Sequence, residues 1–315
     1  LKEEKKRGIS IDLGFAYMAA SDGSVLSFVD VPGHEKFIRN MLAGATGIDF
    51  ILLVVAADDG IMPQTIEHLA IADLLGIKRG VVALSKVDMV SAHRCEEAAL
   101  DIRKHLNGTS LAGAEIPPVS AVTGRGIDAL REKLVDAARH FTDHATDGRF
   151  RLSVDRSFTL SGAGTVVTGT VLSGSVDVGA QVRISPSGLS ARVRSIHAQN
   201  RPSKRGQAGE RCALNLTGDG ITKSAIRRGD VVLEAELHAP TDRIDAQCRV
   251  LASEAKAVAH WTPVRLYHAA DEIEARIVPL GEEPIRPGEA AYFQLVLSEP
   301  TAAAARDSYV LRDTS

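Results

Sequence analysis

The spacing of apolar residues divides the chain near residue 145. Before this point, apolar side chains recur every three or four positions in several segments, and short apolar runs separate those segments. The runs Val25–Val29, Phe50–Ala57 and Gly80–Leu84 are predicted strands; helices are predicted on the stripes that start at Phe37, Ile66, Cys95 and Ile127. Strands that alternate with helices predict a parallel sheet covered on both faces.

The period changes from about 3.6 to 2 after the polar stretch 142–149. Phe150, Leu152, Val154 and Phe158 alternate with polar residues, and short strands punctuated by glycine continue to Leu233. This pattern predicts a small antiparallel barrel, and residues 238–315 repeat it. We therefore predict an α/β domain over 1–143 and two β-barrel domains over 148–235 and 238–315.

Composition narrows the class of protein. The formal net charge of −3 over 315 residues gives no overall basic character, so any contact with nucleic acid must be local or made by a part of the protein outside this sequence. The three cysteines have no metal-like spacing and fit a reducing compartment, and the longest apolar run is shorter than the ~20 residues of a membrane helix. We expect a cytoplasmic protein that does not cross a membrane.

The strongest chemical motif is DVPGHEKF at 30–37. Asp30 follows a predicted strand, at the end of a sheet where α/β proteins bind ligands, and its carboxylate could hold a water on Mg²⁺. Gly33 allows its backbone N–H to approach a terminal phosphate. His34 follows directly and could orient an attacking water; the alternative is an ordinary turn with a solvated histidine.

Two further segments follow predicted strands. In SKVD at 85–88, Asp88 could accept hydrogen bonds from N1 and the amino group of guanine, and the stem of Lys86 could cover the base. In VSAVTGRGID at 119–128, backbone N–H groups near Ser120 and Ala121 could reach the guanine carbonyl. Each motif alone also fits a solvated surface, so their order and spacing carry the argument.

Taken together, the three motifs resemble those of the translational GTPases. The segment KRGISIDLGFAY at 6–17 is similar to the first switch of that family, where a threonine hydroxyl binds Mg²⁺; Ser10 stands at that position. The resemblance implies GTP and GDP as ligands, Mg²⁺ held by Ser10 and through water by Asp30, base contacts from Ser85, and hydrolysis assisted by His34.

The resemblance extends to the second domain, where DRSFTLSGAGTVVTGTVLSG at 155–174 is similar to that of elongation factors. The segments EKKRGISIDLGFAY and HAQN, and a hydroxyl residue at Ser85 in place of asparagine, resemble the SelB group. This group implies delivery of selenocysteyl-tRNA to the ribosome at recoded stop codons. It also implies a monomer, and an mRNA hairpin read by a C-terminal region that this sequence does not reach.

Arg156 interrupts the alternation that predicts the first barrel. It takes an apolar-face position after Val154, where an unpaired guanidinium would be costly, so either a β-bulge turns it outward or it has an anionic partner. By the resemblance, Asp155, Arg156 and Arg211 line the pocket for the aminoacyl group, and an arginine suits an ionised selenol. A surface arginine, or an ion pair with Asp155 or Glu210, is the alternative.

No segment matches the phosphate-binding loop G-x-x-x-x-G-K-[ST]. The resemblance places that loop upstream of residue 1, so we expect an incomplete P-loop GTPase-type domain; a degenerate relative that has lost catalysis is the alternative. Other tRNA-handling GTPases, such as elongation factor Tu or an initiation-factor γ subunit, should carry asparagine at position 85 and an acidic residue at 156. A sulfate-activating GTPase or an RNA-binding scaffold on the same fold also stays open.

Overall fold

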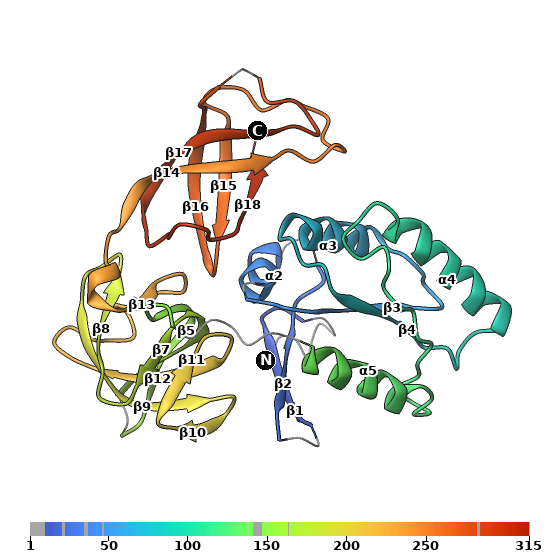
Figure 1. Ribbon diagram of the computed structural model, residues 1–315, viewed down its shortest axis with the longest axis horizontal. Coiled ribbons are helices and arrows are strands. Elements are labelled where there is room, and N and C mark those ends of the chain that lie inside the picture. Colours follow the sequence, from blue (N-terminus) through green and yellow to red (C-terminus); the bar gives the residue numbers. More distant parts are fainter. Residues whose placement is uncertain are drawn as a thin grey trace. The chain divides into compact units, whose positions relative to one another are not determined.

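A computed structural model describes residues 10–20, 23–34, 37–45, 47–140, 147–162, 164–281 and 284–314 (Figure 1). The chain divides into two compact units, one of residues 1–41 and 48–142 and one of residues 42–47 and 143–315. Within the described residues, no helix is long and apolar enough to cross a membrane.

The N-terminal part of the chain alternates strands and helices, as the sequence predicts. The elements are β1 (Gly14–Ala19), β2 (Val25–Asp30), α2 (Ile38–Ala45), β3 (Ile51–Ala56), α3 (Pro63–Leu74), β4 (Gly80–Ser85), α4 (Ala92–Leu106) and α5 (Ile127–Arg139). Strand β1 was not predicted, because its residues were assigned to a switch segment. It runs antiparallel to β2 and pairs Gly14 with Asp30, so the strands of this part are not all parallel.

Strands β3 and β4 form a parallel pair, and residues 115–118 continue the parallel arrangement through bridges to Val81 and Leu84. Val82 and Leu84 face one core, with Ala98 and Ile102 of α4. Val81 and Ala83 face the other core, with Leu130 and Leu134 of α5. Figure 1 shows α3 and α4 on one side of β3 and β4 and α5 on the other, which confirms the prediction of a sheet covered on both faces.

The second domain is a closed antiparallel barrel. Its strands are β5 (Arg151–Leu160), β6 (Gly164–Ser173), β7 (Ser175–Asp177), β8 (Gln181–Ser185), β9 (Ser190–Ala198), β10 (Arg201–Ser203), β11 (Arg205–Gln207), β12 (Arg211–Thr217) and β13 (Val231–Leu233), followed by the short helix η2 (Ala235–Leu237). The sheet order is β10-β9-β12-β6-β5-β13-β8, and an additional β9–β8 pairing closes it. Phe150, Leu152, Val154, Val167 and Leu214 fill its core.

One glycine of this barrel has no tolerated substitute. A Cβ on Gly169 of β6 would lie 1.9 Å from the backbone oxygen of Ser153 on β5, which would force the two strands apart. Gly169 pairs with Val154, and the irregularity in the pairing of β5 and β6 begins directly after that residue.

The third domain is a five-stranded antiparallel sheet curved around its own core. Its strands are β14 (Thr241–Arg249), β15 (Pro263–His268), β16 (Asp271–Pro279), β17 (Ala290–Thr301) and β18 (Tyr309–Asp313), in the order β14-β17-β16-β15-β18. Leu266, Ile273, Phe293 and Leu295 lie in the core.

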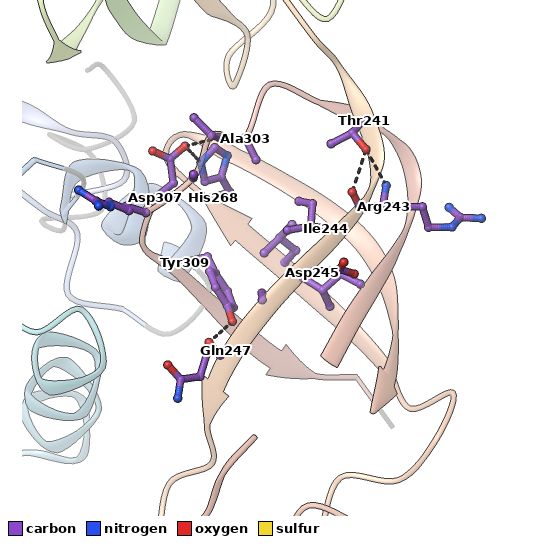
Figure 2. A pocket seen from close by; sticks show the side chains of 15 residues that line it. Thr241, Arg243, Ile244, Asp245, Gln247, His268, Ala303, Asp307 and Tyr309 are labelled. Atoms are coloured by element: carbon purple, nitrogen blue, oxygen red, sulfur yellow. Dashed lines mark hydrogen bonds and ion pairs between the residues drawn. The ribbon is translucent and has the colours of Figure 1, made fainter. Parts of the chain in front are cut away.

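The described strands β14 and β18 are the two edges of this sheet and do not pair with each other. A cavity of about 480 Å³ lies between β14 and residues 303–309. Figure 2 shows Tyr309 beside Gln247, to whose backbone oxygen the Tyr309 hydroxyl donates a hydrogen bond.

Candidate functional site

The turn that follows β2 carries Asp30, Gly33 and His34. Asp30 is exposed at the end of the strand and pairs with Gly14. A Cβ on Gly14 would lie 3.2 Å from the Cβ of Asp30. His34 is half-buried, with its ring 5.9 Å from that of Phe37. The carboxylate of Asp30, the backbone of Gly33, which carries no side chain, and the imidazole of His34 therefore follow one another closely along the chain at the end of β2.

The segment before β1 is tied to helix α2. Asn40 Nδ2 donates to the backbone oxygen of Ile11 at 2.7 Å, and Leu13 N donates to the Asp12 carboxylate at 2.9 Å. Ser10 is half-buried at the start of this segment. Residues 6–9 of the switch-like motif lie outside the described residues.

The SKVD and VSAV segments, in which the sequence predicts base contacts, meet, as their positions after neighbouring strands predict. Val87 N donates to Val119 O at 3.4 Å, and Val119 N donates to Leu84 O at 2.8 Å. Asp88 and Ala121 are exposed beside this junction. Carboxylate and backbone groups from both segments are therefore available to one ligand.

Ser120 fixes the second segment from beneath. It is fully buried, its N–H donates to Arg125 O at 2.9 Å, and its Oγ accepts from Thr123 N at 3.1 Å. Ser85 is anchored similarly, because its Oγ donates to Val55 O at 3.3 Å on the adjacent strand. The hydroxyl at position 85 thus bonds to the sheet.

Lys86 adopts a left-handed backbone conformation with φ 57°, which is uncommon outside glycine. Its Nζ lies 2.9 Å from Asp58 Oδ2 and 3.3 Å from Asp59 Oδ2. Hydrogen bonds with these carboxylates raise the pKa of Lys86, and the hydrogen bond from Lys86 lowers the pKa of Asp58. These ion pairs hold the ammonium group of Lys86, and the aliphatic stem lies next to the contact between Val87 and Val119.

A β-bulge decides the orientation of Arg156. Val154 pairs with Gly169 and Arg156 with Thr168, so Asp155 is an extra residue on β5. Because cross-strand partners point to the same face, Arg156 lies on the outer face with Thr168, opposite to the core residue Val154. The expected position on the apolar face is therefore wrong, and the bulge is the alternative that holds.

Asp155 and Arg211 form an ion pair on this outer face. Arg211 Nε donates to Asp155 Oδ2 and Nη2 to Oδ1, both at 3.0 Å. The Thr168 hydroxyl donates to Asp155 Oδ1 at 2.5 Å and accepts from Arg211 Nη2 at 3.0 Å. The side chains of Asp155 and Arg211 are only 9% and 15% exposed, so water screens this pair weakly.

The consecutive strands β5 and β6 and the distant strand β12 thus supply one charged cluster. Asp155 and Arg156 come from β5, Thr168 from β6 and Arg211 from β12. The row of paired residues continues from Thr168 through Ala213 to His197 on β9. The HAQN motif therefore begins on the same face as Arg156.

Five basic side chains, called here the basic cluster, are exposed on β9, β10 and β11 and at the residue between the last two strands: Arg192, Arg194, Arg201, Lys204 and Arg205. Arg205 is held in a bidentate pair with Asp177 at 3.0 and 3.1 Å.

Two side chains near these sites gave no usable signal in the sequence. His68 of α3 lies against the turn, since a Cβ on Gly33 would be 3.9 Å from its ring, and burial lowers the pKa of His68. Thr168 sits in an ordinary strand pattern, and only the pairing of β5, β6 and β12 shows that it joins Asp155 to Arg211.

The family comparisons cover most of the chain. Residues 1–140 match the elongation factor Tu GTP binding domain, and residues 164–233 match elongation factor Tu domain 2. Residues 245–315 match the beta-barrel domain of the selenocysteine-specific elongation factor.

Individual relatives agree with these matches. The chain is 32% identical to elongation factor 1-alpha of Methanopyrus kandleri, of which it covers 79%. It is 44% and 41% identical to selenocysteine-specific elongation factors of Escherichia coli and Desulfomicrobium baculatum over its whole length. The chain spans about half the length of these two relatives, 49% of each.

Solved structures show the same fold. A bacterial selenocysteine-specific elongation factor, EF-Sec, superposes with a TM-score of 0.89 at 32% identity, over all of this chain and 51% of that one. Elongation factor SelB from Methanococcus maripaludis, in complex with the GTP analogue GppNHp, gives 0.84 at 26% identity, over 96% and 69%.

The chain belongs to the elongation-factor family of GTPases that includes elongation factor Tu and elongation factor 1-alpha. Within that family, the selenocysteine-specific elongation factors are similar to this chain over all of its residues, and its third domain matches the beta-barrel domain of those factors. The predicted fold class, a GTPase-type domain followed by two β-barrel domains, is confirmed.

Proposed function

We propose that this chain is the nucleotide-binding and aminoacyl-binding part of a GTPase that delivers selenocysteyl-tRNA to the ribosome at recoded stop codons. The proposal rests on the similarity to selenocysteine-specific elongation factors and on the charged cluster of the second domain. The domain limits 1–143, 148–235 and 238–315 belong to the same proposal.

The junction of the two base-recognition segments serves guanine. Asp88 is exposed where it can accept from N1–H and the exocyclic amine, two donors that adenine does not present together. The stem of Lys86 covers the base while its ammonium stays paired with Asp58 and Asp59. Ser85 keeps the segment on the sheet, and the N–H groups near Ser120 and Ala121 face the guanine carbonyl.

The turn after β2 serves the γ-phosphate and the attacking water. Gly33 donates its N–H to the phosphate, and His34 orients the water. Asp30 and Ser10 fit Mg²⁺, because that ion takes few protein oxygens and fills the remaining positions with water and phosphate. When bound, Mg²⁺ supplies positive charge to the phosphate oxygens.

The observation that carries the substrate assignment is the charge balance of the cluster in the second domain. Asp155 and Arg211 form an ion pair, and Arg156 on the same face adds a second guanidinium, so the three side chains together carry one net positive charge. A selenol is more acidic than a thiol and is ionised at neutral pH, so a selenolate would neutralise the cluster. The hydroxyl of serine would leave the charge unbalanced in a poorly screened site.

The remaining parts of the proposal extend the resemblance to the selenocysteine-specific elongation factors. The factor works as a monomer in the cytoplasm, binds the ribosome, and reads an mRNA hairpin through a region that these residues do not include. The exposed basic cluster over 192–205 is available to tRNA phosphates.

Seryl-tRNA is the matched comparison that tests the substrate assignment, because it is the precursor of the selenocysteyl form. Dissociation constants for both aminoacyl-tRNAs are measured in the GTP state at one salt concentration, with the protein in a form that carries a phosphate-binding loop. We expect Arg156→Ala to weaken binding of selenocysteyl-tRNA by about tenfold or more and to change binding of seryl-tRNA little.

Arg192→Ala is the matched control, since Arg192 is an exposed arginine of the same barrel that lies outside the Asp155–Arg156–Arg211 cluster. It should leave the ratio of the two constants unchanged. Equal losses for both tRNAs in Arg156→Ala would assign Arg156 to the shared tRNA backbone and refute the selenolate pocket.

A further inference from the structure

The third domain contacts the start of strand β5, the strand that carries Asp155 and Arg156 of the charged cluster. Arg151 lies only three residues before Val154, and its guanidinium meets Asp307 in the loop between β17 and β18. Arg151 Nη1 donates to Asp307 Oδ1 at 2.8 Å, and Arg151 Nη2 donates to Asp307 Oδ2 at 2.6 Å. Both side chains are largely buried, 10% and 18% exposed, so the pair is shielded from water.

Asp307 is itself held in place within the third domain. Its Oδ2 accepts from His268 Nε2 at 2.8 Å and from Ala304 N at 2.9 Å, and Figure 2 shows His268 and Asp307 adjacent on one wall of the cavity. An ionised carboxylate only accepts, so Nε2 carries the proton. Burial alone would raise the pKa of Asp307, but hydrogen bonds from His268 and Arg151 outweigh it and hold this pKa well below its usual range.

A second contact links β5 to the third domain through the turn that ends at Asp230. The turn that ends at Asp230 continues the β13 edge: Val154 N donates to Asp230 O and Gly229 N donates to Val154 O, both at 2.9 Å. Gly229 has φ +96° and packs on Asp271 of the third domain, where a Cβ would lie 2.9 Å from the Asp271 Cα. Only glycine fits this backbone and this spacing.

Both contacts involve residues of β5 that lie directly before the bulge. Arg151 and Val154 are fixed by the third domain or by the turn that rests on it, and the next residue is Asp155. Asp155 must hold Arg211 and Thr168 at 2.5–3.0 Å. A shift of β5 by a few tenths of an ångström would therefore misalign the cluster on the opposite side of the bulge.

We propose that Asp307 is a positioning residue: with His268 and Arg151 it couples the third domain to β5 and so sets the geometry of the aminoacyl cluster in the second domain. Selectivity for the aminoacyl group then depends on a residue of another domain that touches neither the tRNA nor the cluster. This inference rests on the proposed function of the Asp155–Arg156–Arg211 cluster.

The test is Asp307→Asn in the complete protein, with dissociation constants for selenocysteyl-tRNA and seryl-tRNA in the GTP state. The amide keeps the shape of the side chain but loses the charge that Arg151 and His268 share. We expect the preference for selenocysteyl-tRNA to fall roughly tenfold while the constant for seryl-tRNA stays within about threefold.

The matched control is Arg227→Gln. It breaks another ion pair between the same two domains, Arg227 with Glu299 at 3.3 Å, but that pair is exposed, at 63% and 47%. It should leave the preference unchanged. If Asp307→Asn does not fold, Arg151→Lys keeps the charge and loses only the fork, and a smaller loss of preference in the same direction is expected.

Equal weakening for both tRNAs, or an unchanged preference in a folded variant, would overturn the positioning role. A wild-type protein with no preference at all would instead overturn the proposed function. If Arg211→Met abolishes the preference and Asp307→Asn does not, only the coupling through the third domain is wrong.

Discussion

Removing one partner of the Asp155–Arg211 pair should be far more damaging than removing both. In Arg211→Met, the Asp155 carboxylate stays 9% exposed and keeps only the Thr168 hydroxyl among the partners described above. Breaking a fully buried pair in this way costs about 3–5 kcal/mol. Because Arg211 keeps 15% exposure, we expect a loss of about 2–4 kcal/mol in the free energy of unfolding.

The double variant Asp155→Leu with Arg211→Met should recover most of this loss. It removes both charges and leaves apolar side chains of similar length, so its stability should lie within about 1 kcal/mol of the original. The double variant keeps Arg156 and therefore one net positive charge, so part of the preference for selenocysteyl-tRNA should return together with the stability.

The assay is urea unfolding of the chain, followed by circular dichroism and by the fluorescence of Trp261, the one tryptophan in the sequence. Arg205→Met is the matched control, since Arg205 forms a bidentate pair with Asp177 in the same barrel, with 58% and 59% exposure. An exposed pair contributes about 0–1 kcal/mol. If Arg211→Met costs no more than Arg205→Met, or if the double variant loses as much as the single one, the reasoning about burial is wrong.

Three further predictions concern other groups. His34→Ala should leave nucleotide binding nearly intact and slow ribosome-stimulated GTP hydrolysis by ~10² or more, measured as phosphate release; unchanged turnover would remove His34 from the mechanism. Asp88→Asn should shift the preference from GDP toward xanthosine diphosphate in competition binding, because the new amide donates where xanthine has an oxygen; an unchanged preference would mean that Asp88 does not read the base. Burial raises the pKa of Asp230 to about 6 from 3.8, so the folded state holds this proton more tightly and the free energy of unfolding should fall as pH rises from about 4 to 6. Asp230→Asn should remove roughly 2–3 kcal/mol of this fall, as measured by urea titrations at several pH values, and an equally large fall would contradict the assignment.

Local pattern was sufficient for the elements and for the order of the motifs. The stripe from Cys95 to Leu106 predicts a helix, and α4 spans Ala92–Leu106 with Ser91 as its N-cap, accepting from Arg94 N. The change of period near residue 145 separates the helical part from the barrels, because burial against a helix layer and burial inside a barrel demand different spacings. The order of DVPGH, SKVD and SAV indicated the family for a similar reason: each follows a strand end, and strand ends are visible locally.

The tertiary structure alone decided which way β5 presents its charges. Strict alternation places Arg156 on the core face, but the bulge at Asp155 inserts one residue, and every later side chain changes face. That insertion depends on pairing with Gly169 and Thr168 of β6, which no spacing within β5 records. Strand β1 was missed for the same reason, since its antiparallel partner is what makes it a strand.

The partners of the charged groups were equally beyond local reasoning. Asp155 and Arg211 are 56 residues apart in sequence, and Arg151 and Asp307 are 156 apart. The sequence limited Asp155 to a few possible roles, because a carboxylate among strand residues needs a cation or a hydrogen bond. Which cation it meets depends on the order of β12, β6 and β5 in the barrel, and that order is set by the packing of core side chains far from either charge.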